Sequence, residues 1–265
     1  METNVALDKR QIRQSFANAA QSYDAMATLQ RKVGHELIAK LAMPHEAMVV
    51  DVGCGTGFFT QQLRDRALLE NILALDVAMP MLLKARQRLD DISIPLVCAD
   101  AEQLPFASHS IDGLVSNLAL QWCQGLGEMF ADVFRVLRAN GSFVFSTFGE
   151  SALCELKAAW AAVDDYPHVN DFCNLSLIKQ HLQAAGFVDV QLESRVYQIK
   201  YNDVIELMRE LKGIGAHNVS QARNKTLTTK GQLQVLVAAY PKDDDGKITA
   251  SYEIIYVQAK VGGDI

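Results

Sequence analysis

A run of glycines between an apolar segment and a stretch of helical spacing is the most informative chemical feature of this 265-residue sequence. The pattern is Asp51-x-Gly53-x-Gly55-x-Gly57, and it follows the apolar run that begins at Ala47. Glycines at a strand-to-helix turn let the backbone approach a ligand closely, and the free amides of the helix start bind anionic or polar groups. The sequence therefore predicts a cofactor site at this turn.

Two classes of cofactor-binding protein use such a turn, and the glycine spacing separates them. Dinucleotide-binding proteins use G-x-G-x-x-G, which seats a pyrophosphate on the helix start. That spacing fails here, because Phe58 occupies the third position after the first glycine pair and Thr60 occupies it after the second. A nicotinamide-dependent dehydrogenase is therefore disfavoured. A plain tight turn without a ligand is the alternative interpretation of the glycines alone.

Polar residues follow the next three predicted strands. Asp76 ends the second strand, the Asp100-Ala101 pair follows the third, and Asn117 ends the fourth. A carboxylate at the position of Asp76 can accept two hydrogen bonds from the vicinal hydroxyls of a ribose. Because the C-terminal ends of strands form the ligand crevice of open α/β sheets, these residues should converge on the glycine turn. Capping of a helix by Asp76 and of a loop by Asp100 are the structural alternatives.

Strands and helices alternate through the first 150 residues, which predicts a parallel sheet covered by helices on both faces. We expect strands at residues 47–51, 71–76, 95–98, 111–117, 142–147, 188–199 and 248–261, and helices at 58–67, 79–89, 129–137, 175–185 and 202–212. The chain shows no repeat or linker, so we expect a single domain. Its expected parts are an N-terminal helical lid (1–43), a cofactor-binding core (44–199), a helical insertion (200–247) and the last strand and tail (248–265).

Composition is typical of a globular protein and disfavours several other classes. Hydrophobic residues make up 49%, charged residues 21%, and the net charge is −6, which argues against disorder and against nucleic-acid binding by the chain as a whole. No apolar run approaches the roughly 20 residues of a membrane span, and the N-terminus lacks signal-peptide features. The five cysteines lack metal-ligand spacing, so we expect free thiols, no metal and a cytoplasmic protein.

The glycine turn and the polar strand ends together resemble the class I methyltransferases, which use S-adenosyl-L-methionine. The resemblance implies a Rossmann-like α/β fold with a mostly parallel seven-stranded sheet and an antiparallel last strand. It implies that Asp51 helps to hold the amino acid end of the cofactor, Asp76 the ribose, and Asp100 with Ala101 the adenine. The residues expected at the cofactor are Asp51, Gly53, Gly55, Gly57, Asp76, Asp100, Ala101, Asn117 and Gln30.

Segments outside the cofactor motifs are similar to the malonyl-[acyl-carrier protein] O-methyltransferase family of biotin biosynthesis, often called BioC. These segments are residues 16–30, 121–122, 211–218 and 252–256. The resemblance extends from about residue 8 to residue 260. It implies transfer of a methyl group from S-adenosylmethionine to the free carboxylate of a malonyl thioester, either malonyl-acyl-carrier protein or malonyl-CoA. The product would be the malonyl methyl ester that primes pimeloyl synthesis.

Candidate residues for the acceptor side are Tyr23, His217 and Asn218. The aromatic position in the N-terminal signature places Tyr23 over the methyl donor, where its ring would face the sulfonium. His217 and Asn218 are candidate donors to the malonyl carboxylate, as are Arg195 and Arg209, and the sequence does not rank them. An apolar helix stripe that includes Tyr23 and a helix end at His217 are the structural alternatives. The functional alternatives are methylation of a quinone or phenol, and a cofactor-binding scaffold without catalysis.

Charge is unevenly distributed along the chain. Residues 195–230 hold seven basic and three acidic residues, a net +4, so the rest of the chain carries −10. A basic segment on an acidic body is a candidate docking surface for an acidic partner. Acyl-carrier proteins are acidic, and we therefore expect docking through Arg209, Lys212, Arg223 and Lys225.

Overall fold

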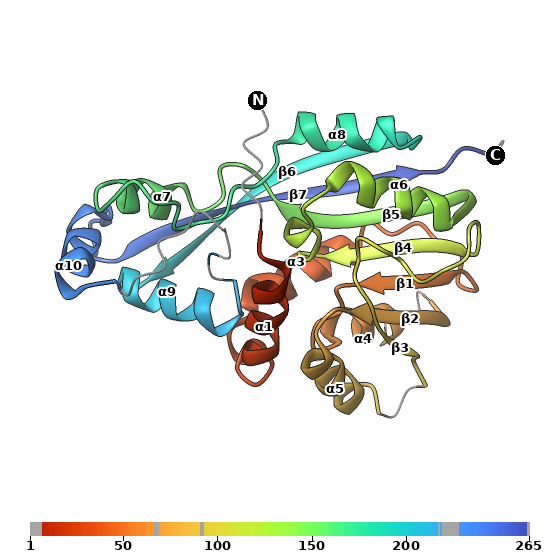
Figure 1. Ribbon diagram of the computed structural model, residues 1–265, viewed down its shortest axis with the longest axis horizontal. Helices are drawn as coiled ribbons and strands as arrows, with labels where there is room; N and C mark the ends of the chain where they lie inside the picture. Colours follow the sequence, from red (N-terminus) through yellow and green to blue (C-terminus); the bar gives the residue numbers. More distant parts are fainter. Residues whose placement is uncertain (1–6, 66–68, 91–92, 217, 219–227, 264–265) are drawn as a thin grey trace.

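A seven-stranded sheet in the order β3-β2-β1-β4-β5-β7-β6 forms the centre of the computed structural model, which describes residues 7–65, 69–90, 93–216, 218 and 228–263 (Figure 1). The strands are β1 (Met48–Val52), β2 (Asn71–Asp76), β3 (Leu96–Cys98), β4 (Ile111–Asn117), β5 (Leu137–Phe148), β6 (Val188–Tyr201) and β7 (Ile248–Lys260). Neighbouring strands from β3 to β5 pair in parallel, and β7 is antiparallel to both β5 and β6. The predicted class I methyltransferase sheet is confirmed.

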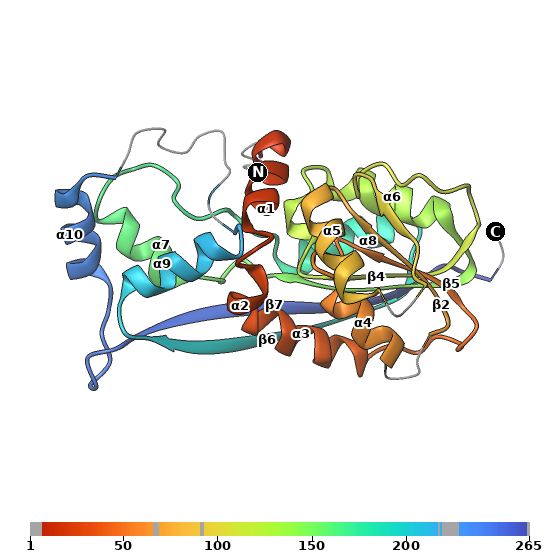
Figure 2. The same ribbon diagram turned by 90° about the horizontal axis from the view of Figure 1, so that it is seen from below.

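Helices cover both faces of the sheet, with α3 and α4 on one side and α6 and α8 on the other (Figure 2). The helices are α1 (Lys9–Ala19), α2 (Tyr23–Met26), α3 (Thr28–Ile38), α4 (Phe58–Asp65), α5 (Met79–Arg88), η1 (Leu120–Trp122), α6 (Leu126–Val136), α7 (Cys154–Ala161), α8 (Leu175–Ala184), α9 (Val204–Gly213) and α10 (Lys230–Ala239). Alternate residues of β1 face the two layers: Val49 packs in the cluster that includes α3 and α4, and Val50 in the cluster that includes α6 and α8. Burial of both faces accounts for the continuous apolar run of this strand.

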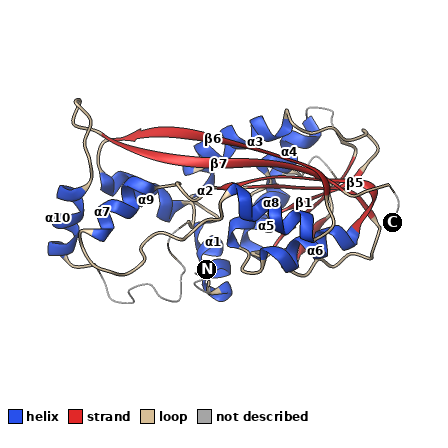
Figure 3. Ribbon diagram, turned by 90° about the horizontal axis from the view of Figure 1, so that it is seen from above, coloured by secondary structure: helices blue, strands red, loops and turns tan. Residues whose placement is uncertain are grey.

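The hairpin of β6 and β7 extends beyond the other strands (Figure 3). β5 pairs with β7 only from Ile254 to Lys260, whereas β6 continues to pair as far as Ile248. Helices α7 and α10 pack against each other and α7 packs on β7, while α9 packs on β6. We call α7, α9 and α10 the insertion lobe. The predicted insertion helix at 202–212 corresponds to α9, whereas α7 and α10 were not predicted.

The expected N-terminal helical lid consists of three short helices, α1, α2 and α3. α1 ends at Ala19, and Tyr23 begins the separate helix α2. α1 packs on α5, and α2 packs on α9. The N-terminal helices therefore lie between the sheet domain and the insertion lobe (Figure 2).

Candidate active site

The glycine turn joins β1 to α4 at the C-terminal ends of the parallel strands. Gly53, Gly55 and Gly57 have φ angles of +73°, +55° and +81°, a region that L side chains rarely adopt. The amide of Gly53 donates to the Leu75 carbonyl over 2.8 Å, which ties the turn to β2. A Cβ at Gly53 would lie 2.2 Å from the Cβ of Ala119. The turn can therefore contact the segment after β4 only because residue 53 is glycine.

Gly55 and Gly57 have different surroundings. A Cβ at Gly55 would project into open space, and Gly55 borders two cavities. A Cβ at Gly57 would lie 3.1 Å from Ala85 on α5, and Gly57 lines neither cavity. The structure thus leaves room for a ligand beside Gly55 and places Gly57 at a close contact between the turn and α5. We had expected Gly57 at the cofactor, but its position favours a packing role.

Asp51 is buried at the end of β1, with 1% of its surface exposed. Its Oδ2 accepts a hydrogen bond from Thr60 Oγ1 over 2.5 Å, whereas Oδ1 is buried without a partner among the described residues. Burial raises the pKa of Asp51 to about 7, although the Thr60 hydrogen bond acts in the opposite direction. A buried carboxylate oxygen that lacks a partner fits a cationic ligand group such as an ammonium.

Asp76 is buried at the end of β2 and holds two backbone amides. Its Oδ2 accepts from Gly55 N over 2.9 Å, and its Oδ1 accepts from Ala78 N over 2.8 Å. Burial raises the pKa of this carboxyl, and the backbone hydrogen bonds oppose that shift. Asp76 therefore joins the residue before α5 to the glycine turn. It also borders a cavity, so the structural and the ligand-binding interpretations of this residue are compatible.

Two cavities meet at the glycine turn. The Asp76 cavity has a volume of about 110 Å³ and lies between α1, the turn and the ends of β2 and β4. The Gln30 cavity has a volume of about 40 Å³ and lies between α2, α3 and the turn. The residues that border both are Tyr23, Gly53, Gly55 and Asn117. Together the cavities form an elongated site suited to a ligand with two parts.

Asp100 and Ala101 border the Asp76 cavity, as expected from their place after β3. Asp100 Oδ2 pairs with Lys9 Nζ of α1 over 3.0 Å, and Lys9 also pairs with Glu102 over 2.9 Å. Asp100 Oδ1 accepts from the Glu102 amide over 3.0 Å. This ion pair, which joins α1 to Asp100 on the wall of the cavity, was not predicted.

Asn117 links the end of β4 to α3. Its Nδ2 donates to the Gln30 carbonyl over 2.9 Å, and its Oδ1 accepts from Ser146 Oγ over 2.9 Å. These bonds fix the Asn117 side chain. Gln30 borders the Gln30 cavity and also a third, larger cavity on the side of the insertion lobe. α3 therefore separates the proposed cofactor site from a neighbouring space.

Tyr23 lies where the Asp76 and Gln30 cavities meet. Its ring packs against Ala19, Ala20, Ala78 and Met81. Its hydroxyl has no hydrogen-bond partner among the described residues. Burial, with the nearby carboxylates of Asp76 and Asp24, raises the pKa of this hydroxyl above its ordinary value. Tyr23 is thus a neutral aromatic ring that both packs the lid and covers the proposed cofactor site.

The third cavity, which we call the Trp160 cavity, has a volume of about 220 Å³ between α3, α7, α9 and β7. Its polar and aromatic lining includes Gln30, Trp122, Trp160, His168, Asn170, Glu210, Lys212, Asn218 and Tyr252. Asn218, a candidate donor to the malonyl carboxylate, lines this cavity, and its Nδ2 donates to the Pro167 carbonyl. His217 lies outside the described residues. Because Gln30 and Trp122 also border the cofactor-side cavities, the Trp160 cavity lies next to them.

Residues of the 160–172 segment line this cavity, and they were not predicted as site residues from the sequence. The ring of His168 stacks on Trp160 with centroids 3.7 Å apart and an interplanar angle of 7°. His168 Nε2 lies 2.7 Å from Asp164 Oδ1. The i, i+4 spacing of Asp164 and His168 was the available signal, but it falls in a segment without regular periodicity.

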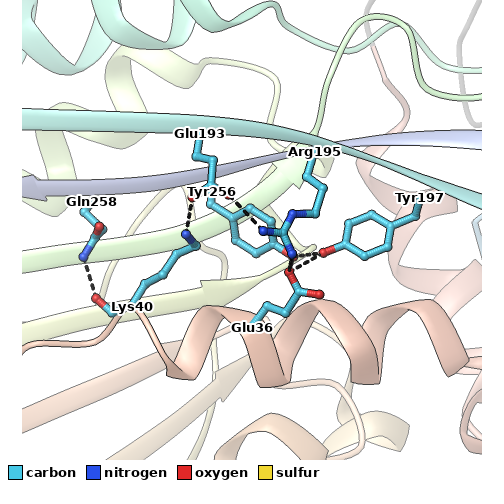
Figure 4. A network of polar contacts seen from close by, with 7 residues as sticks. All are labelled: Glu36, Lys40, Glu193, Arg195, Tyr197, Tyr256 and Gln258. Carbon is cyan, nitrogen blue, oxygen red and sulfur yellow. Dashed lines mark hydrogen bonds and ion pairs between the residues drawn. The ribbon is translucent and has the colours of Figure 1, made fainter.

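Arg195, a candidate donor to the acceptor, belongs to a separate network (Figure 4). Its guanidinium lies 2.5 Å from Glu36 Oε2 and 3.3 Å from Glu193 Oε1. Tyr197 donates to the same Glu36 oxygen over 2.6 Å. This network joins α3 to β6 and β7, and Arg195 borders none of the three cavities described above. The structure thus gives Arg195 a structural role.

The basic stretch does not form one continuous surface among the described residues. Like Arg195, Lys200 is paired, with two carboxylates of the turn before β7. The side chains of Arg209 and Lys212 on α9 and of Lys230 at the start of α10 are exposed. The positions outside the described residues are Arg223 and Lys225. Within the described part of this stretch, the exposed cations other than Arg195 and Lys200 therefore lie on the insertion lobe.

Several expectations about other site types concern the described part of the chain. All five cysteines are free thiols, as expected. The described residues contain no cluster of three or more potential metal ligands. Among the same residues, no helix has the length and apolar character needed to cross a membrane.

The sheet order and the glycine turn define the class to which the protein belongs. A family model described as a methyltransferase domain matches residues 50–145. A solved structure, the YcgJ protein from Bacillus subtilis, aligns with a TM-score of 0.66 at 16% identity, covering 87% of this chain and 98% of that one. At that identity the likeness shows the fold alone. The protein is a class I methyltransferase that uses S-adenosyl-L-methionine as methyl donor.

Sequence relatives narrow the class to one family. The malonyl-[acyl-carrier protein] O-methyltransferase of Methylococcus capsulatus is 40% identical over 253 residues, covering 94% of this chain and 92% of that protein. The biotin biosynthesis bifunctional protein BioHC of Cellvibrio japonicus is 39% identical over 254 residues, covering 95% of this chain, which spans 50% of that longer protein. The chain belongs to the malonyl-[acyl-carrier protein] O-methyltransferase family.

Features of the site fit S-adenosylmethionine. Asp51, like Gly57, borders neither cavity, but its partnerless oxygen suits the ammonium of the methionine part, and the open space at Gly55 leaves room for the ligand. The Asp76 carboxylate borders the adjoining cavity, where a ribose would require hydrogen-bond acceptors.

Proposed function

We propose that the protein methylates the free carboxylate of a malonyl thioester, carried by an acyl-carrier protein or by coenzyme A. The observation that carries the proposal is the similarity to the Methylococcus capsulatus enzyme, which spans nearly the whole of both chains. The structure adds a cofactor-type site and, next to it, the Trp160 cavity, which has polar and aromatic walls. The product, a malonyl methyl ester, would serve biotin synthesis.

The chemistry makes modest demands on the residues of the chain. S-adenosylmethionine supplies a methyl group activated by its sulfonium. A carboxylic acid with a pKa near 4 is already ionised at neutral pH, so the acceptor needs no general base. One acceptor oxygen forms the bond to the methyl carbon, and the electron pair of the broken carbon–sulfur bond stays on sulfur. The residues must therefore orient the two reactants and exclude water.

We assign orientation to the residues of the glycine turn and strand ends. Asp51 binds the ammonium, Asp76 the ribose hydroxyls, and Asp100 with Ala101 the adenine side. The Tyr23 ring covers the reacting end and excludes water, and its high pKa keeps it neutral at physiological pH. Asn117 supports the site indirectly, because its side chain already holds α3 in place.

The acceptor is proposed to enter the Trp160 cavity. Trp122 and Gln30 border both this cavity and the cofactor-side cavities, so an acceptor here would lie next to the methyl donor. Asn170, Asn218 and Tyr252 supply neutral polar groups along its wall.

The free thiols are compatible with a reducing compartment, and we propose a cytoplasmic location.

Complementation tests the proposed function. A bacterial strain that lacks its own malonyl-acyl-carrier protein methyltransferase should grow without biotin when it expresses this chain. The Methylococcus capsulatus relative is the positive control, and the Asp76→Ala variant of this chain is the negative control. Rescue by the relative but not by this chain, at equal protein levels, would contradict the proposal.

A further inference from the structure

The segment between α7 and α8 holds an imidazole in a fixed position on the wall of the Trp160 cavity. One face of the His168 ring lies flat on Trp160, 3.7 Å away between centroids. Its Nε2 lies 2.7 Å from Asp164 Oδ1. His168 also lines the Trp160 cavity. Such a ring cannot rotate freely, because both its plane and one edge are held.

Asp164 is itself held by neighbouring groups. Its Oδ1 also accepts from the Tyr166 amide over 3.0 Å, and its Oδ2 accepts from Gln232 Nε2 of α10 over 3.3 Å. Asn218 holds the backbone beside the imidazole through the Pro167 carbonyl. Three parts of the insertion lobe thus converge on one histidine. These hydrogen bonds would be unnecessary if His168 only packed against apolar neighbours.

We propose that His168 binds the acceptor carboxylate and distinguishes the anionic substrate from the neutral ester product. This inference rests on the proposed function. Because Nε2 is engaged with Asp164, the ring would bind an anion through an N–H on its other nitrogen, Nδ1. A single N–H binds one carboxylate oxygen and leaves the other available to the methyl carbon. Methylation removes the negative charge, so the ester loses this charge-assisted bond and leaves more readily.

The other charges around the cavity favour one well-placed cation. Glu210 of α9 lines the same cavity and accepts a hydrogen bond from Tyr201, and burial raises its pKa. Lys212 lines the cavity as well, but its side chain is exposed. Asp164 places a carboxylate beside the His168 ring. His168 is therefore held in a fixed position, whereas Lys212 lies on a flexible stem.

Binding measured without turnover tests this assignment. The affinities of two ligands on the same acyl-carrier protein, malonyl and its methyl ester, are compared by calorimetry with S-adenosylhomocysteine present. We expect the wild-type protein to prefer the malonyl form, and His168→Gln to lose roughly tenfold to a hundredfold of affinity for it with little change for the ester. S-adenosylmethionine binding should be unchanged. His45→Gln, at an exposed site before β1, is the matched control.

Asp164→Asn is a second, independent test that keeps the shape of the segment. It removes the negative charge beside His168 Nε2, so the preference for the malonyl form over its methyl ester should fall here too. The Michaelis constant for malonyl-carrier protein should rise more than the turnover number falls. An unchanged preference in either folded variant would overturn the inference. If the wild-type protein methylates malonyl-carrier protein but both variants keep the preference, His168 is not the anchor and the proposed function stands. If the wild type transfers no methyl group to malonyl, the proposed function itself fails.

Discussion

Asp51 shows at the scale of one residue how burial prepares a ligand site. A carboxyl group normally titrates near 3.8, and the environment at the end of β1 raises the pKa of Asp51 to about 7. The folded pKa lies above the unfolded one, so this group's contribution to stability is fully present below pH 3.8 and is lost as the pH rises through 7. A cation beside Oδ1 would offset the cost of ionisation.

The first prediction concerns proton release on cofactor binding. Below pH 7 the ligand-free Asp51 holds a proton that it must lose to pair with an ammonium. The affinity for S-adenosylmethionine should therefore rise with pH, by up to about tenfold per unit, and level off above 7. Calorimetry in buffers of different ionisation enthalpy would detect the released proton. Asp51→Asn should flatten this dependence, and Asp112→Asn, remote from the site, should keep it.

The second prediction separates the two roles of Asp76. Asp76→Ala removes the proposed ribose acceptors and the bonds to Gly55 and Ala78, so the affinity for S-adenosylmethionine should fall at least tenfold and the melting temperature should fall as well. Asn174→Ala removes the cap of α8, which typically costs about 1 kcal/mol, and should leave the affinity unchanged. Wild-type affinity in a folded Asp76→Ala protein would show that this residue only supports the turn.

At the scale of elements, the lid and the insertion lobe are held together by close backbone contacts. Ser22 Oγ donates to the Gly213 carbonyl over 2.7 Å. Gly215 has a φ of +74°, and a Cβ there would lie 3.1 Å from the Ser15 carbonyl and 3.2 Å from Ala19. Gly213, the last residue of α9, and Gly215 after it thus let this segment approach α1 and α2. α1 and α2 also cover the cofactor-side cavities. We therefore expect the N-terminal lid and the insertion lobe to move together.

The third prediction tests this coupling between the N-terminal lid and the insertion lobe. Gly215→Val introduces a strained φ and a side chain that meets α1, together a cost of about 2–4 kcal/mol. We expect faster dissociation of S-adenosylmethionine and a higher Michaelis constant for the acceptor, measured by stopped-flow and steady-state kinetics. Gly231→Ala is the matched control, because a Cβ there meets nothing and the position is helical. Equal cofactor dissociation rates in the two variants would argue against the coupling.

The elements of the sheet domain were predictable because local pattern and tertiary role agree there. The predicted strands at 71–76 and 111–117 match β2 and β4 at both ends. α7 was missed because it is short and apolar and follows Leu153, whose φ of 58° provides no recognisable cap. α10 carried a readable signal, the capping box of Thr229 and Gln232, that the apolar spacing did not reveal.

The site was predictable to the extent that single positions carry the chemistry. Asp76, Gly55 and Asn117 lie together because strand ends converge in this fold. The pairing of Lys9 with Asp100 joins residues far apart in the sequence, and no periodicity reports such a contact. The same holds for His168, whose role depends on Trp160 lying under its ring. Arg195 was a candidate donor to the malonyl carboxylate, but it is ion-paired with Glu36 and Glu193. Basic character alone does not show whether a cation is already paired.

At the scale of the whole molecule, the insertion lobe extends from the sheet domain on the β6–β7 hairpin (Figure 1). Among the described residues, the exposed cations of the predicted docking stretch other than the ion-paired Arg195 and Lys200 lie on this lobe, at Arg209, Lys212 and Lys230. Lys212 also lines the Trp160 cavity, so a change there affects the acceptor directly. Arg209 and Lys230 are therefore the positions at which docking can be tested separately.

The fourth prediction concerns encounter with the carrier protein. Exposed charges act mainly on association and are screened within about 8–10 Å at physiological salt. Methylation of malonyl-carrier protein should slow as salt rises, and methylation of malonyl-CoA should change little. Reversal of Arg209 and Lys230 to Glu should raise the Michaelis constant for the carrier protein alone, whereas Arg86→Glu on α5 should not. Unchanged kinetics in the double reversal would place docking elsewhere, for example around Arg31 and Lys32.

The central claim is that the acceptor atom is the free carboxylate oxygen of a malonyl thioester. The most direct measurement incubates the purified protein with methyl-labelled S-adenosylmethionine and a panel of malonyl, acetyl and phenolic acceptors. We predict label only in the malonyl thioesters, in a methyl ester that mild base releases as methanol. Label in a base-stable product, transfer to acetyl thioesters or phenols, or cofactor binding without transfer to any malonyl thioester would contradict the account.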